Sequence, residues 1–198
     1  MKNIAIFASG NGTNAQNIIS HFNGGNIASV KMVICNNPNA YVLQRASALG
    51  VSATVVDKAA LTADNPSGLL ALLHDNAIDY IVLAGYLQKI PAALTTEFSG
   101  RIINIHPALL PKFGGKGMYG MHVHKAVVDA GEKLSGITIH LVDAVYDNGK
   151  ILFQAQCPLS PDDTPEDVAV KVQALEQQHY PAIIEKYILE ESSQEAQL

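Results

Sequence analysis

The chain has 198 residues, 48% hydrophobic and 16% charged, a composition typical of one compact α/β domain and unlike that of disordered or collagen-like chains. Its 13 Lys and Arg against 18 Asp and Glu leave a net charge of −5, which argues against a nucleic-acid partner because such surfaces are basic. No apolar run approaches the roughly 18 residues of a membrane span, and no signal-peptide core precedes Ser9, so we expect a cytoplasmic protein with no membrane partner.

Short apolar, β-branched runs alternate with segments of helical periodicity, which predicts βαβ units and a doubly wound, mainly parallel sheet. The predicted strands, too continuously apolar to have one face in water, are residues 3–8, 29–35, 51–56, 79–84 and 101–105. The predicted helices are residues 14–22, 40–49, 67–76 and 91–98.

The pattern changes after residue 120. A helix near 121–130 precedes two β-rich runs, 136–142 and 150–158, which predict a hairpin at the sheet edge. Thr164 is a predicted N-cap for a long last helix, whose apolar spacing runs to about Leu189. We therefore expect one domain over residues 1–189 and a frayed acidic tail over 190–198.

A glycine-rich turn, Ser9 to Gln16, joins the first strand to the first helix. Backbone amides of such a turn and the positive end of the helix dipole attract a phosphate. The turn fits the G-x-G-x-x-A dinucleotide fingerprint, but no acidic residue follows the second strand to bind a ribose hydroxyl, and no P-loop lysine is present. A monophosphate site is favoured, with a plain tight turn as the alternative. No acidic residue precedes Asp57, so an anion is not repelled there.

Asn104 and His106 lie two residues apart in a predicted strand, so their side chains project from the same face. Together they could donate hydrogen bonds to an oxygen that develops negative charge, as acyl transfer requires. The alternative is a structural histidine beside a turn-capping asparagine. Ligands of open parallel sheets bind beyond the carboxyl ends of the strands, where this pair and the glycine-rich turn both lie, and this favours the functional interpretation.

Four motifs in order resemble the phosphoribosylglycinamide formyltransferase family, folate-dependent enzymes of purine synthesis with a Rossmann-like formyltransferase fold. They are Gly-Asn-Gly-Thr-Asn at 10–14, Ala-Gly-Tyr-Leu at 84–87, the segment from Asn104 to Lys112, and Asp-Asn-Gly at 147–149. The resemblance runs from residue 3 to about 187. It implies formyl transfer from 10-formyltetrahydrofolate to the amine of glycinamide ribonucleotide, with no metal, by a monomer or weak homodimer.

Site residues follow from the resemblance position by position. Asn104, His106 and Asp147 are the implied catalytic residues. Gly12, Thr13 and Asn14 would hold the substrate phosphate, and Glu176 would contact the glycinamide end. Leu87, Gln88, Lys89 and Ile90 would meet the folate pterin, with Asn104 also beside the folate. We expect Asn104 and a protonated His106 to stabilise an oxyanion, while Asp147 favours the imidazolium and relays a proton. The alternative for Asp147 is simply the first residue of a turn.

Other features carry weaker expectations. His122 and His124 would point apart on a helix, which argues against zinc, and Cys35 and Cys157 are expected to be free buried thiols. Four glycines in residues 113–120 suit a mobile flap over the folate, or a disordered surface loop.

The family often carries an arginine toward the folate glutamate tail, yet residues 61–73 hold no basic residue, so Lys58 or Lys89 would have to substitute. The central residue of the usual Asp-Gly-Gly turn is Asn148, which a left-handed conformation tolerates.

Three other functions share some of these features. 10-Formyltetrahydrofolate hydrolase uses water in place of the amine but has an additional regulatory domain, and methionyl-tRNA formyltransferase needs a basic C-terminal domain. A non-enzymatic nucleotide-phosphate-binding domain would use the glycine-rich turn alone, and would have no need of Asn104, His106 and Asp147.

Overall fold

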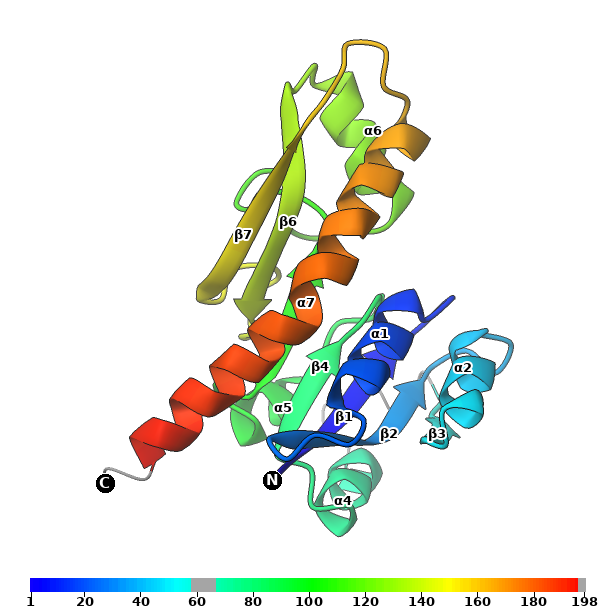
Figure 1. Ribbon diagram of the computed structural model, residues 1–198, viewed down its shortest axis with the longest axis vertical. Helices are drawn as coiled ribbons and strands as arrows, with labels where there is room; N and C mark the ends of the chain where they lie inside the picture. Colours follow the sequence, from blue (N-terminus) through cyan, green and yellow to red (C-terminus); the bar gives the residue numbers. More distant parts are fainter. Residues whose placement is uncertain (58–66, 196–198) are drawn as a thin grey trace.

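In the computed structural model, which describes residues 1–57 and 67–195, seven strands form one mixed sheet in the order β3-β2-β1-β4-β5-β6-β7 (Figure 1). The five parallel strands are β1 (Lys2–Ala8), β2 (Ala28–Cys35), β3 (Ser52–Val55), β4 (Tyr80–Leu83) and β5 (Ile102–His106). These strands confirm the predicted doubly wound sheet, since the chain moves outward from β1 first to one side and then to the other.

Helices cover both faces of the parallel part. One face packs against α1 (Thr13–Phe22), α2 (Val42–Ala48) and α7 (Pro165–Glu195), and the other against α4 (Ser67–Asp75) and α5 (Ala92–Glu97). In β1, Ile4 and Ile6 belong to the first apolar cluster, whereas Ala5 and Phe7 belong to the second. This burial on both sides explains why the central strands are continuously apolar.

The predicted edge hairpin is confirmed. β6 (Leu134–Leu141) pairs antiparallel with β5, and β7 (Ile151–Pro158) pairs antiparallel with β6 at the sheet edge. The connection between them crosses close to β6: a Cβ atom on Gly149 would lie 1.8 Å from the Leu141 carbonyl oxygen, so only glycine fits there. The sequence predicts a left-handed backbone at Asn148, but in the structure the residue of this turn with a left-handed backbone is Asp147 (φ +52°).

The last helix is longer than predicted. α7 continues to Glu195, past the end of the apolar spacing at Leu189, because the Glu and Gln residues of 190–195 favour a helix without any apolar face. The single-domain boundary at 189 stays a prediction. Pro181 lies inside α7 and cannot donate to the Gln177 carbonyl four residues earlier; Asn17 Nδ2 of α1 donates to that carbonyl instead, at 2.7 Å. None of the helices in the described part of the chain has the length and apolar character that a membrane crossing requires.

Candidate active site

A cavity of about 680 Å³ opens at the carboxyl ends of β4 and β5. Its walls come from the segments after these two strands, from the glycine-rich segment 115–120, from the β6–β7 connection and from α7. Asn104, His106 and Asp147, which come from distant parts of the chain, all line it. Ligands of open α/β sheets bind at this edge, so the cavity is where the sheet topology predicts a site.

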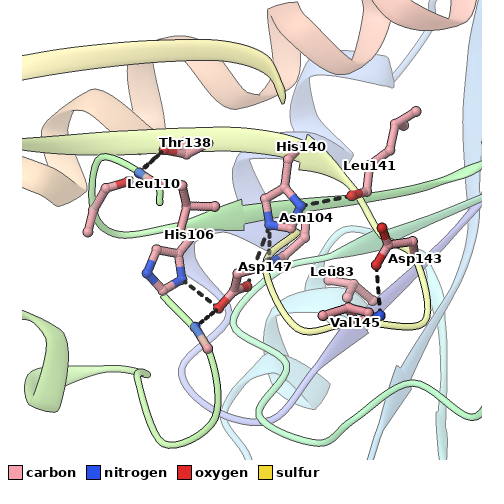
Figure 2. Close-up of polar contacts among 12 residues, drawn as sticks. Leu83, Asn104, His106, Leu110, Thr138, His140, Leu141, Asp143, Val145 and Asp147 are labelled. Carbon is pink, nitrogen blue, oxygen red and sulfur yellow. Dashed lines mark hydrogen bonds and ion pairs between the residues drawn. The ribbon is translucent and has the colours of Figure 1, made fainter. Parts of the chain in front are cut away.

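Asn104 is held by a histidine from the neighbouring strand. His140 lies directly opposite Asn104 in the β5–β6 pairing, and its Nε2 is 3.1 Å from Asn104 Nδ2 (Figure 2). His140 Nδ1 is 2.8 Å from the Leu141 carbonyl, which only accepts, so Nδ1 carries the proton of the neutral ring. His140 Nε2 therefore accepts from the Asn104 amide and orients it.

His106 is buried, with 4% of its surface exposed, and both ring nitrogens face protein groups. Nε2 donates to the Phe113 carbonyl at 2.8 Å. Nδ1 faces Asp147 Oδ2 at 3.7 Å (Figure 2). Burial lowers the pKa of His106 from its ordinary value, and this outweighs the opposing effect of the Asp147 carboxylate. Burial thus favours the neutral ring in the free protein and the Asp147 carboxylate favours the imidazolium, so the protonation of His106 during the reaction stays a prediction.

Asp147 lies between the two histidines. Its Oδ1 is 3.6 Å from His140 Nε2, and its Oδ2 accepts a hydrogen bond from the Gly115 backbone N–H at 2.8 Å. At Gly114 a Cβ atom would lie 2.5 Å from Leu110 Cδ2 and 3.3 Å from Asp147 Cβ, so glycine lets this segment approach the carboxylate closely. Residues 113–115 thus contact both His106, through the Phe113 carbonyl, and Asp147, through the Gly115 N–H.

A second polar group links α1 to α7 at the same cavity. Asn14 Nδ2 donates to Glu176 Oε2 at 2.8 Å, and Gln177 Nε2 donates to Asn14 Oδ1 at 2.8 Å. Asn14 and Glu176 both line the cavity. Burial raises the pKa of Glu176, and the hydrogen bond from Asn14 only partly offsets this.

The segment from Leu87 to Ile90 forms another wall of the cavity. Leu87 N donates to Ser9 Oγ at 3.1 Å, which ties this wall to the turn after β1. The Lys89 ammonium lies 5.5 Å from the centre of the Tyr146 ring, so this wall contacts the β6–β7 connection there. Lys58, the other candidate for the missing arginine, lies outside the described residues.

Most of the residues expected from the sequence share this cavity: it is lined by Asn14, Leu87, Gln88, Lys89, Ile90, Asn104, His106, Asp147 and Glu176. Gly12 and Thr13 do not line it; they form the start of α1 next to Asn14, and Thr13 Oγ1 accepts from Gln173 Nε2 at 3.3 Å. His140 was not expected. His140 and Thr138 are two residues apart in β6, so their side chains lie on the same face of the sheet. Only the register between β5 and β6 places His140 opposite Asn104.

His122 and His124 lie on one helix and point in different directions, as predicted. His122 is exposed and packs edge-on against the Tyr119 ring, whereas His124 is buried in the cavity wall on α6 (Met121–Asp129). Burial lowers the pKa of His124, and the nearby His106 lowers it further. Within residues 1–57 and 67–195, no group of three or more His, Cys, Asp or Glu side chains could hold a metal ion.

The fold and the cavity define an α/β protein whose ligand site lies at the carboxyl edge of a parallel sheet, with an amide, an imidazole and a carboxylate grouped together. Comparison with known proteins agrees with the resemblance seen in the sequence. The formyl transferase family model matches residues 2–184, and the chain belongs to this family.

Individual relatives carry a more specific name. The chain is 37% identical over 192 residues to phosphoribosylglycinamide formyltransferase of Haemophilus influenzae, covering 93% of this chain and 86% of the relative. It is 39% identical to the chloroplastic enzyme of that name from Arabidopsis thaliana, with 92% of this chain covered but only 64% of the plant protein's length. The crystal structure of glycinamide ribonucleotide transformylase 1 from Symbiobacterium toebii superposes with a TM-score of 0.87 at 35% identity, covering 95% of this chain and 88% of that one.

Proposed function

We propose that this protein transfers the formyl group of 10-formyltetrahydrofolate to the amine of glycinamide ribonucleotide, a step of purine biosynthesis. The observation that carries the proposal is the meeting of Asn104, His106 and Asp147 in one cavity. The names of the similar proteins, given above, support the same substrate. A phosphate-binding domain without chemistry would have no use for a buried imidazole grouped with this amide and this carboxylate.

In the proposed reaction the neutral amine attacks the formyl carbon, and a tetrahedral oxyanion forms. The Asn104 amide, oriented by His140, donates to this oxygen. Asp147 takes the amine's proton and passes it through water toward the leaving nitrogen, while protonated His106, whose Nδ1 lies 3.7 Å from Asp147 Oδ2, helps to stabilise the oxyanion. The Asp147 carboxylate and the negative charge that develops on the formyl oxygen both favour the imidazolium, against the burial that favours the neutral ring.

The intermediate collapses when the bond from the formyl carbon to the folate nitrogen breaks. The proton taken from the amine, relayed through water, ends on that leaving nitrogen, so no net charge is left in the cavity. No metal and no covalent enzyme intermediate takes part. A water-poor site strengthens each of these hydrogen bonds, and the burial of His106 fits this requirement.

The two substrates occupy different parts of the proposed site. The phosphate of the ribonucleotide binds the backbone of Gly12, Thr13 and Asn14, where the first turn of α1 contains no acidic residue and no side-chain cap. Glu176, beside Asn14, contacts the glycinamide end. The folate pterin lies along the backbone of residues 87–90, and the glycine-rich segment 113–120 closes over it.

A single assay separates the candidate functions. The protein is mixed with 10-formyltetrahydrofolate in the presence and absence of glycinamide ribonucleotide, and formylated ribonucleotide and free formate are measured. Formyl transfer only with the ribonucleotide supports the proposal. Formate release at the same rate without it indicates the hydrolase, and no turnover in either mixture contradicts enzymatic function. The cytoplasmic location and the monomer or weak homodimer stay predictions.

A further inference from the structure

Helix α2 contacts the glycine-rich turn after β1 through one arginine. Arg45 Nε donates to the Asn11 carbonyl at 2.8 Å, and Nη2 donates to Asn11 Oδ1 at 3.1 Å. Nη1 of the same guanidinium donates to Gln16 Oε1 in the first part of α1. The guanidinium also lies over the Tyr41 ring, 4.8 Å from its centre, which limits its movement.

The neighbouring residues of the turn are held by the first residue of the same helix. Val42 N donates to the Gly10 carbonyl at 3.1 Å. Gly12 packs so closely on Val42 that a Cβ atom there would lie 2.4 Å from Val42 Cγ2 and 2.8 Å from Val42 Cα. Three consecutive residues of the turn, 10 to 12, are therefore fixed by Val42 and Arg45.

The charge of Arg45 is not neutralised by its hydrogen-bond partners. Both partners, Asn11 and Gln16, are uncharged, and none of the first 56 residues is acidic. The guanidinium thus brings a full positive charge to the turn while its donors point at the protein rather than at a ligand. This arrangement differs from a direct phosphate contact, in which the fork of the arginine would face the anion.

We propose that Arg45 is a positioning residue for the phosphate subsite. It holds Asn11 so that the amides at the start of α1 converge on a phosphate dianion, and its charge strengthens binding from behind the turn. It does not touch the substrate. The inference rests on the proposed function for the identity of the substrate, but the subsite can be tested with inorganic phosphate alone.

The test compares Arg45→Lys, Arg45→Met and the control Lys31→Met. Lysine keeps the charge, but one ammonium cannot reach Asn11 O, Asn11 Oδ1 and Gln16 Oε1 together; methionine loses charge and contacts. We expect the Kd for inorganic phosphate, measured by titration calorimetry without folate, to rise about tenfold in Arg45→Lys, equivalent to about 1.4 kcal/mol. Arg45→Met should weaken binding further. Lys31 is exposed on β2, so its variant loses the same charge without touching the turn and should bind as wild type does.

Kinetics give the second readout. The KM for glycinamide ribonucleotide should rise in parallel with the phosphate Kd, whereas kcat and the KM for the formyl donor should change less than about twofold, because Arg45 lies outside the reacting centre. Phosphate binding by Arg45→Lys equal to wild type overturns the proposal, as does wild-type protein that does not bind phosphate. Weakened phosphate binding without any formyl transfer would leave the role of Arg45 standing and contradict the proposed function.

A folding defect is controlled separately. Circular dichroism and the thermal midpoint establish whether Arg45→Lys is folded. If it is not, Asn11→Ala replaces it, since this variant removes only one of the acceptors held by Arg45. An increase of about threefold in the phosphate Kd is then expected from the loss of one hydrogen bond. An unchanged Kd in that variant also overturns the proposal.

Discussion

Asn104 and His140 meet across two antiparallel strands, with Asn104 Nδ2 3.1 Å from His140 Nε2. The amide is therefore already oriented in the free protein. One of its N–H groups donates to the His140 ring, and the other is available to a ligand. A donor fixed in advance needs no reorganisation when charge develops on a bound oxygen, which is the main source of its catalytic effect.

Removing this donor is the first prediction. Asn104→Ala should lower kcat by roughly 10²- to 10³-fold, as found for other oxyanion donors, while the thermal midpoint stays near that of wild type. The measurement is steady-state kinetics with both substrates. Asn26→Ala, at an exposed site away from the cavity, is the matched control. A rate for Asn104→Ala equal to that of the control would remove the amide from the mechanism.

Asp147→Asn tests the electrostatic link between the carboxylate and His106. The Asp147 charge raises the pKa of His106 against the effect of burial, so its loss lets that pKa fall further. Activity that needs the imidazolium declines as pH rises through this pKa. In the variant the decline moves to lower pH, so that activity at neutral pH is lower and depends less on pH than in wild type. NMR titration of the His106 ring checks the shift directly. The exposed Asp75→Asn controls for net charge, and identical profiles for Asp147→Asn and wild type would leave Asp147 with only its role in the turn.

Glu176→Gln should separate stability from substrate binding. Burial raises the pKa of Glu176 in the folded protein, so the ionised carboxylate costs stability at neutral pH, and this cost develops as pH rises from about 4.3, the value in an unfolded chain. Glutamine can still accept from Asn14 without a charge. The variant should therefore have a higher thermal midpoint than wild type at pH 7.5 and the same midpoint near pH 4, together with a higher KM for the ribonucleotide.

The matched control for that experiment is Glu190→Gln on an exposed position of the same helix. It should leave both the midpoint and the KM almost unchanged. A lower midpoint for Glu176→Gln than for wild type at pH 7.5 would show that the carboxylate stabilises the fold through its bond to Asn14 more than its burial costs.

Two glycines of the turn after β1 should differ sharply on substitution. Gly12 has φ +79° and no room for a Cβ atom beside Val42, so Gly12→Ala should destabilise the protein by roughly 1–3 kcal/mol. At Gly10 a Cβ atom would meet nothing within 4 Å, and Gly10→Ala should change stability by less than about 0.5 kcal/mol. Urea unfolding measures both. Equal effects of the two substitutions would mean that the contact between the turn and α2 is not maintained in solution.

The order and type of the elements could be predicted from the sequence because the pattern of apolar residues reflects which faces of each element are buried. The continuously apolar runs correspond to the parallel strands within about two residues, since both faces of these strands are covered. The predicted end of the last helix was too early, because apolar spacing reports only the part of a helix that packs. Beyond Leu189, α7 continues without a buried face, with Ser192 and Ser193 donating to carbonyls four residues earlier.

The sequence by itself determined the chemical groups of the candidate site: the glycine-rich turn, the Asn104–His106 pair on one strand face, and the acid at position 147. Only the tertiary structure decided how these groups are held. His140 orients Asn104 through the register of two strands, Arg45 holds a turn 34 residues away in sequence, and Glu176 meets Asn14 across 162 residues. The direction in which the pKa of His106 shifts also depends on the tertiary structure, because burial of the ring lowers this pKa while the nearby Asp147 carboxylate raises it. Periodicity and local motifs record which face of an element is buried, whereas contacts between distant residues arise only when the elements pack.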